Sequence, residues 1–295
     1  MSTTTSHEIV EFDFARPFAK WAGGKTQLLP ELLARAPKKM DAYVEPFVGG
    51  GALFFALASE PERRYKEAFI IDSNPDLIDA YAAIRENPDR LIQLLSREMY
   101  RYDSDTYYRM RATKPGDMFE CAARFIYLNK TCFNGLWRVN GKVEFNVPFG
   151  KFKNPPRICD PENLHACSKA LQGVSIILGD FETALGLLDN RPLASWIPQS
   201  WCYFDSPYVP LSKTASFTRY AKNGFGPTDQ ARLVKLLREM PCPWLLSNAD
   251  NAETRDMYEA FSVESVPARR SISCKGDKRN AVRELLVQPA WAKRK

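Results

Sequence analysis

Short apolar runs that end in a polar side chain recur along the chain and predict the strands of a parallel sheet. The runs are A-Y-V-E (42–45), A-F-I-I-D (68–72), V-S-I-I-L-G-D (174–180), W-C-Y-F-D (201–205) and P-W-L-L-S-N-A-D (243–250). Continuous apolar runs of this length are typical of strands that helices cover on both faces. Because the carboxyl ends of parallel strands meet at one edge, we expect the terminal polar groups to gather there. The pattern predicts an α/β fold.

Between the second and third runs the pattern becomes helical and then strand-like again. Asn74-Pro75 and Asn87-Pro88 each place a helix N-cap before a proline in the first turn, which predicts two or three amphipathic helices. Residues 136–139 and 143–147 then read as strands around Asn140-Gly141, a dipeptide typical of a tight hairpin turn. The segment therefore predicts helices followed by a β-hairpin.

Charge is concentrated in this same segment. The chain of 295 residues has a formal net charge of +6. Between Arg97 and Arg157, twelve Lys and Arg residues stand against six Asp and Glu residues, so this stretch holds the whole excess. A solvated helix face is one explanation. Aromatic residues interleaved with the basic ones favour a nucleic-acid partner instead.

Cysteine and histidine content argues against several classes of protein. The chain has seven cysteines without a C-x-x-C pair and only two histidines. We therefore expect neither a disulfide framework nor a zinc site, and no metal. The first residues carry acids and lack the apolar core of a signal peptide, and no run approaches membrane-spanning length. These features predict a cytoplasmic protein without a membrane partner.

The hexapeptide Y-F-D-S-P-Y (203–208) carries the clearest candidate chemistry. Asp205 can accept hydrogen bonds, and Ser206 is pushed towards an extended conformation by Pro207, so its carbonyl would lie beside the carboxylate. The ring of Tyr208 can stack on a planar substrate. Two acceptors and a stacking face suit an exocyclic amine on a base; a turn after a buried strand is the alternative.

A glycine turn between strand and helix predicts a second site. The sequence E-P-F-V-G-G-G-A lets the backbone at Gly49 and Gly51 approach a ligand near the start of a helix. Asp72, at the end of the next apolar run, suits the hydroxyls of a ribose. A dinucleotide dehydrogenase is an alternative, but Phe54 is too large for the G-x-G-x-x-G pattern.

The stretch F-A-K-W-A-G-G-K (18–25) offers another alternative. Residues 19–26 nearly match the phosphate-binding G-x-x-x-x-G-K-T loop of nucleotide hydrolases, but Ala19 stands in place of the first glycine and no convincing buried strand precedes it. Two further segments, 209–226 and 269–279, carry basic residues and are expected to form a long loop and a basic turn.

Taken together, these motifs closely resemble those of the Dam-like family of DNA adenine-N6 methyltransferases. The matching motifs, from Phe18 to about Val287, are F-A-K-W-A-G-G-K, E-P-F-V-G-G-G-A, the Asp72 strand, N-K-T-C-F-N-G-L-W-R-V-N, F-N-V-P-F-G-K-F-K-N-P, D-S-P-Y and R-R-S-I-S. The resemblance implies a Rossmann-like sheet of seven mostly parallel strands. Residues 1–75 and 160–295 would form the catalytic domain, and residues 76–159 an inserted target-recognition domain of helices and a hairpin.

The resemblance also implies the ligands and their contacts. The donor would be S-adenosyl-L-methionine, the acceptor double-stranded DNA with GATC as target, and the enzyme a monomer. The cofactor-binding residues would be Trp21, Lys25, Glu45, Phe47, Gly49, Gly51, Asp72, Asp180, Phe181 and Asp205. The catalytic residues would be Asp205, Ser206, Pro207 and Tyr208. The DNA-binding residues would be Lys20, Asn134, Leu136, Arg138, Lys142, Pro148 and Lys151.

Within the last group, the resemblance implies that Arg138 reads guanine, that Leu136 and Pro148 touch the thymine methyl, and that Asn134 lies near the space left by base flipping. Lys20 would contact the outer guanine.

One residue departs from the family pattern. The family usually has D-P-P-Y, and here Ser206 replaces the first proline, which keeps the carbonyl but loses the ring that fixes its φ angle. A catalytically weak DNA-binding relative is therefore an alternative. A second is an RNA adenine methyltransferase, because a basic hairpin can face either polymer.

Overall fold

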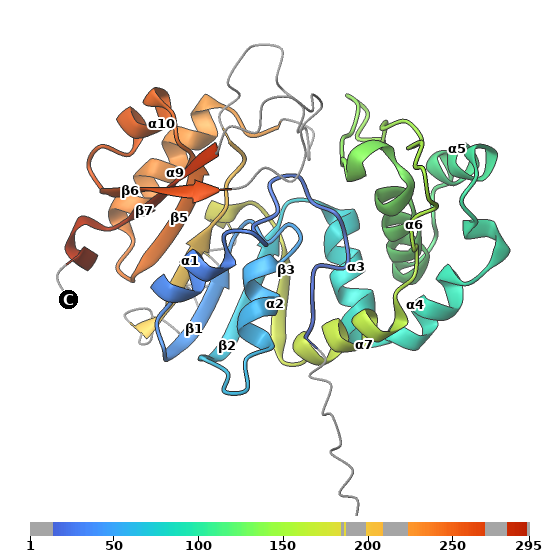
Figure 1. The fold of residues 1–295 in the computed structure, drawn as a ribbon, viewed down its shortest axis with the longest axis horizontal. Helices are drawn as coiled ribbons and strands as arrows, with labels where there is room; N and C mark the ends of the chain where they lie inside the picture. Colours follow the sequence, from blue (N-terminus) through green and yellow to red (C-terminus); the bar gives the residue numbers. More distant parts are fainter. Residues whose placement is uncertain (1–13, 184–185, 187–198, 209–223, 269–281, 294–295) are drawn as a thin grey trace, which may run out of the picture.

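A seven-stranded sheet forms the centre of the molecule. The computed structural model describes residues 14–183, 186, 199–208, 224–268 and 282–293. The strand order is β3-β2-β1-β4-β5-β7-β6 (Figure 1). The strands are β1 Met40–Glu45, β2 Tyr65–Asp72, β3 Val174–Leu178, β4 Trp201–Phe204, β5 Trp244–Ala249, β6 Ser262–Ala268 and β7 Val282–Gln288. Strands β1 to β5 pair in parallel and β7 is antiparallel to both neighbours, which confirms the predicted α/β fold.

Helices pack around the sheet, and several of them form a group beyond one side of it (Figure 1). They are α1 Leu29–Arg35, α2 Ala52–Ala58, α3 Pro75–Glu86, α4 Pro88–Leu95, α5 Ser104–Ala112, α6 Met118–Thr131, α7 Pro161–Ala170, α9 Pro227–Glu239 and α10 Ala252–Met257. Both predicted N-caps are confirmed, since the side chains of Asn74 and Asn87 accept hydrogen bonds from Leu77 N and Arg90 N. Four α-helices, α3 to α6, stand where the sequence pattern predicted two or three.

Two apolar layers lie on opposite faces of the sheet. Alternate residues of each strand enter different layers, as the period of a β-strand requires. Tyr203 of β4 belongs to the layer that contains α1, α2, α3 and α7, whereas Phe204 belongs to the layer that contains α9. Consecutive residues of the Y-F-D-S-P-Y stretch therefore face different helices.

The predicted hairpin forms only in part: residues 136–139 and 143–147 are not strands and share a single isolated bridge, and the turn differs from the prediction. Val139 and Phe145 form an antiparallel bridge, and Asn146 N donates to Arg138 O at 3.0 Å. The left-handed residue is Val143, with φ 63°, rather than Gly141. The cause is the side chain of Asn140, whose Oδ1 accepts hydrogen bonds from the backbone N–H groups of Lys142 and Glu144 and so stabilises a longer turn.

Strand β3 also differs from the expectation. It lies at the edge of the sheet with β2 as its neighbour and ends at Leu178, which is exposed, so the run 174–180 is not a buried strand. Among residues 14–39 the structure contains no strand ahead of residues 19–26, so the strand that a phosphate-binding loop requires is missing. The basic segments 209–223 and 269–279 lie outside the described residues.

Candidate active site

Asp205 stands at the carboxyl end of β4 and forms an ion pair with the buried Lys25. Lys25 Nζ lies 2.7 Å from Asp205 Oδ1, and Ser247 Oγ, on the neighbouring strand β5, donates to the same oxygen at 3.2 Å. The Lys25 side chain is 4% exposed and also donates to Gly23 O. Burial raises the pKa of Asp205, and the charge of Lys25 opposes this rise. The glycine-rich loop is thus attached to the acid that the sequence singled out.

Tyr208 completes the group around Asp205. Its hydroxyl donates to Glu284 Oε2 at 2.9 Å, and Lys25 Nζ lies 4.8 Å from the centre of its ring. The carbonyl of Pro207 accepts a hydrogen bond of 3.0 Å from Gln230 Nε2 of α9. Sequence reasoning missed Glu284, although an acid within the apolar run V-R-E-L-L-V of β7 was a visible signal.

The turn after β1 is held by Asp72 and Trp21. Gly49 N donates to Asp72 Oδ2 at 3.1 Å, and Asn74 N donates to Asp72 Oδ1 at 2.9 Å. A Cβ atom at Gly49, which has φ +48°, would lie 2.5 Å from the Trp21 ring, so only glycine fits there. Burial raises the pKa of Asp72 to about 6. The strand end, the glycine turn and the tryptophan therefore form one unit.

Three aromatic rings stand beside this unit. Phe47 and Phe181 stack with ring centres 5.3 Å apart, and Phe225 meets Phe47 edge-on at 5.5 Å. Arg232 of α9 lies over Phe181 and pairs with Asp180 at 2.8 Å, which fixes the first turn after β3. The structure thus places Phe181 and its neighbour Asp180, which the resemblance assigns to the donor site, next to Phe47. Phe225 was missed, because a lone aromatic after a long loop gives no positional signal.

Glu45, the last residue of β1, is buried. Its side chain is 2% exposed and accepts a hydrogen bond of 2.7 Å from the hydroxyl of Tyr43. Burial raises the pKa of Glu45 to about 8, although the Tyr43 hydrogen bond opposes the rise. The carboxyl of Glu45, which the resemblance assigns to the donor site, is therefore enclosed next to Tyr43.

Six of the seven predicted DNA-binding residues, all except Lys20, lie on the loops after α6. Phe133 N donates to Pro148 O at 2.9 Å, so the two segments lie side by side. Arg138 is half-buried, and its Nε donates to Asn146 Oδ1 at 2.8 Å. The remaining members differ in exposure: Asn134 and Leu136 are half-buried, while Lys20, Lys142, Pro148 and Lys151 are exposed.

A buried asparagine joins Lys20 to this surface. Asn129 Oδ1 accepts from Lys20 N at 2.7 Å, and Asn129 Nδ2 donates to Lys20 O at 2.7 Å and to Gly135 O at 3.3 Å. The Lys20 ammonium lies 4.8 Å from the ring centre of Phe152. Next to this junction, Phe133 is an aromatic side chain with 48% exposure that sequence reasoning missed.

Comparison with known protein families finds a model that matches most of the chain. The sequence model of the D12 class N6 adenine-specific DNA methyltransferases matches residues 21–272. The chain belongs to this family. It is therefore an adenine-specific DNA methyltransferase, and the expectations of a nucleotide hydrolase, a dehydrogenase or an RNA methyltransferase are wrong.

Curated relatives match the methyltransferase over most of their length. The type II methyltransferase M.MjaIII of Methanocaldococcus jannaschii is 42% identical, covering 92% of this chain and 98% of the relative. The type II methyltransferase M1.LlaDCHI of Lactococcus lactis subsp. cremoris is 36% identical, covering 92% and 94%. The DNA adenine methylase of Escherichia coli K12 is also 36% identical, again covering 92% and 94%.

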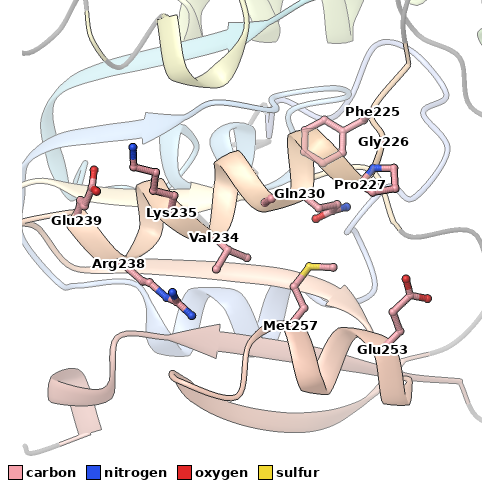
Figure 2. A pocket seen from close by; sticks show the side chains of 11 residues that line it. Phe225, Gly226, Pro227, Gln230, Val234, Lys235, Arg238, Glu239, Glu253 and Met257 are labelled. Carbon is pink, nitrogen blue, oxygen red and sulfur yellow. The ribbon is translucent and has the colours of Figure 1, made fainter.

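A cavity of about 650 Å³ lies between α9 and α10 of the methyltransferase (Figure 2). Phe225, Val234 and Met257 supply its apolar lining, and none of the predicted donor or DNA residues borders it. Gln230 lines the cavity and also donates a hydrogen bond to the carbonyl of Pro207. The cavity therefore lies behind the Y-F-D-S-P-Y stretch.

Within the described ranges, no group of three or more His, Cys, Asp or Glu side chains is arranged to hold a metal ion. In the same part of the chain, no helix has the length and apolar character needed to cross a membrane.

The buried carboxyl of Glu45 predicts a pH dependence of stability. Between about pH 4.5 and 8 the folded methyltransferase holds a proton on Glu45 that the unfolded chain releases, so stability falls as pH rises through this window, by about 1.4 kcal/mol per pH unit at most. We expect the wild type to lose stability to urea between pH 6 and pH 8, a range in which Asp72 has already passed the midpoint of its titration, and Glu45→Gln to lose much less.

The exposed Glu67 on β2 provides the matched control. Glu67→Gln should keep the wild-type pH dependence. Equal slopes for wild type and Glu45→Gln would contradict the assignment of the buried proton to Glu45.

Proposed function

We propose that the methyltransferase moves a methyl group from S-adenosyl-L-methionine to N6 of an adenine that is flipped out of duplex DNA, within the sequence GATC. The observation that carries the proposal is the position of Asp205. It lies at the end of β4, where Lys25 and Ser247 contact its carboxylate and Lys25 also lies over the ring of Tyr208. Open α/β sheets bind their ligands at this edge.

The residues around Asp72 fit the donor. The D12 family uses S-adenosylmethionine, whose sulfonium supplies an electrophilic methyl group. Asp72 would accept hydrogen bonds from the ribose hydroxyls, and its contact with Gly49 N would keep the glycine turn in place. Asp180, fixed by Arg232, and Phe181 would bound the adenine of the donor. Phe47, stacked on Phe181, would belong to the loop on the methionine side.

The Y-F-D-S-P-Y stretch would hold the target amine. Lys25 and Ser247 both contact Oδ1 of Asp205, so Oδ2 is the atom we expect to accept one N–H of the amine. The carbonyl of Ser206 would accept the other, and Tyr208 would stack on the flipped base. Holding both N–H groups directs the lone pair of N6 towards the methyl group, so alignment and the polar clamp supply the catalysis.

DNA would lie across the loops after α6, within the target-recognition domain of residues 76–159. Arg138 would read guanine, with Leu136 and Pro148 at the thymine methyl, and Lys142 and Lys151 would bind phosphate. The exposed ring of Phe133, next to Asn134, is suited to fill the space that the flipped base leaves. GATC as the target is supported by the resemblance of these motifs to the Dam-like pattern.

Removing the ribose acceptor is the direct test of the donor site. Asp72→Ala should weaken S-adenosylmethionine binding by about tenfold or more, because a hydrogen bond to a charged group contributes roughly 1.5–3 kcal/mol. DNA affinity should stay close to that of wild type. Calorimetry with the donor, and Glu86→Ala at the exposed end of α3 as control, decides the matter. Unchanged donor affinity in Asp72→Ala would remove Asp72 from the donor site.

The target sequence is tested with labelled donor and a set of duplexes. We expect methyl transfer to duplexes that contain GATC and much slower transfer to duplexes with any one of its base pairs replaced. Single-stranded DNA and RNA of the same sequence serve as further substrates. Equal transfer to GATC and to its substituted forms would contradict the proposed target and leave adenine methylation itself intact.

A further inference from the structure

Ser206 faces a buried polar cluster rather than solvent. The last register pair of the parallel strands β4 and β5 is Phe204 with Leu246, so Asp205 comes level with Ser247 and Ser206 with Asn248. The hydrogen bond from Ser247 to Asp205 agrees with this extension of the register. Because side chains alternate, Ser206 and Asn248 point to the α9 face of the sheet, where Phe204, Leu246 and Tyr258 pack together.

Three polar atoms of this cluster are enclosed. Ser206 is 1% exposed, and Asn248 and Tyr258 are 0% exposed. In the described part of the chain, Ser206 Oγ, Asn248 Nδ2 and Tyr258 Oη each lack a hydrogen-bond partner of standard geometry. The Asn248 and Ser206 side chains nevertheless lie close enough to Tyr258 to lower its pKa against the rise that burial causes.

The chemistry of the three groups is complementary. An amide N–H donates, and the two hydroxyls both donate and accept, so a chain from Asn248 Nδ2 through Tyr258 to Ser206 satisfies every member after small rotations. Buried polar groups are nearly always paired, and a shared chain is the arrangement these three allow. A further hydrogen bond reaches this stretch from α9, where Gln230 donates to the carbonyl of Pro207.

We propose that Ser206 Oγ, Tyr258 and Asn248 form a positioning device that fixes the backbone of residue 206, in place of the proline ring of the D-P-P-Y pattern. The inference rests on the proposed function, in which the Ser206 carbonyl accepts an N–H of the target amine. A proline ring restricts φ covalently. Here hydrogen bonds to the Ser206 hydroxyl are made on the α9 face of the sheet. These hydrogen bonds, rather than a proline ring, hold the backbone carbonyl of Ser206 in place. Tyr258 and Asn248 are positioning residues, because neither touches the substrate.

Tyr258→Phe removes the central hydroxyl and keeps the packing of the ring. We expect the single-turnover rate of methyl transfer to fall about five- to tenfold, the factor that one net hydrogen bond contributes, with donor and DNA affinities unchanged. Ser206→Ala should cause a similar fall, and the double variant should be no slower than either single one, since both break the same chain. Tyr65→Phe is the matched control, because its hydroxyl is also buried without a partner in the described chain, on the amino-terminal part of β2.

Ser206→Pro provides the decisive background. In Ser206→Pro the proline ring fixes the φ angle, so the hydrogen-bond chain is not needed. Tyr258→Phe should therefore lower the single-turnover rate in the wild-type background and leave it unchanged in the Ser206→Pro background. The inference is overturned if Tyr258→Phe behaves like Tyr65→Phe, or if it slows both backgrounds equally.

A urea-unfolding double-mutant cycle between Ser206→Ala and Tyr258→Phe gives a readout that does not depend on activity. Coupling between the two substitutions supports the chain even if the wild type methylates no adenine, a result that would defeat the proposed function alone. Strict additivity of the two substitutions contradicts the chain, whatever the activity.

Discussion

Asp205→Asn should lower the single-turnover rate of methyl transfer by a factor of about 10²–10³, the loss that follows removal of one preorganised group at a reacting centre. The carboxylate stands at the end of β4 with Lys25 and Ser247 on Oδ1, so its orientation is set before the substrate arrives. An amide in its place presents a donor where the amine needs an acceptor. Donor and DNA affinities should change far less than the rate.

The structure determines which substitution is informative. Asp205→Ala would leave Lys25, which is 4% exposed, without its carboxylate partner, and breaking a buried pair in this way costs about 3–5 kcal/mol of stability. Loss of activity would then reflect partial unfolding as well as lost chemistry. Asparagine keeps the shape and an oxygen for Lys25.

Asp41→Asn is the control for Asp205→Asn. Asp41 also lies on a sheet strand, β1, and pairs with a lysine, Lys66, but near the amino end of that strand. Near wild-type rates are expected for it. Near wild-type rates for Asp205→Asn would show that the amine is not held by this carboxylate.

Arg138→Ala and Lys142→Ala should separate base reading from phosphate binding. Arg138 is half-buried, and Asn146 holds its Nε at 2.8 Å, so its planar end has a fixed direction suited to guanine O6 and N7. Its loss should cost roughly 1–3 kcal/mol of binding free energy on the preferred site. It should also reduce the preference of the enzyme for that site over sites altered at one guanine. Lys142 is exposed in the turn and has no such restraint. Its loss should weaken all duplexes about equally and lower the salt slope by about one unit.

Methylation of GATC and singly substituted duplexes across a salt series measures both effects. Asn146→Ala is a useful third variant, since it should reproduce part of the Arg138 effect by freeing the guanidinium. If Arg138→Ala lowers every rate equally and keeps its discrimination, the arginine binds the backbone and the reading residue lies elsewhere.

Strand ends were predictable because the sheet is parallel. An acid that closes an apolar run must come to the carboxyl edge, so Asp72 and Asp205 could be placed from their local sequence alone. Asp250 also comes to this edge, but its contacts could not be predicted. It follows β5, but it pairs with Arg255 and accepts from Ser265, contacts to the next helix and the antiparallel strand β6 that no local pattern indicates.

Contacts between distant segments account for the features of the site that could not be predicted from the sequence. The pair between Lys25 and Asp205 depends on how a loop before the first strand folds over the sheet, and the pair between Tyr208 and Glu284 depends on the insertion of β7 next to β5. The turn at Asn140 was mispredicted for another reason. Its side chain competes with the tight turn for backbone N–H groups, and propensity alone does not decide that competition.

Nucleoside analysis of methylated duplex DNA tests the central claim most directly. A duplex containing GATC is incubated with labelled S-adenosylmethionine and either wild type or Asp205→Asn, then digested and separated. The account predicts N6-methyl-2′-deoxyadenosine as the labelled nucleoside with wild type, and about a hundredth of that rate or less with Asp205→Asn. Label in a cytosine derivative, or equal label in adenine with both proteins, would contradict it.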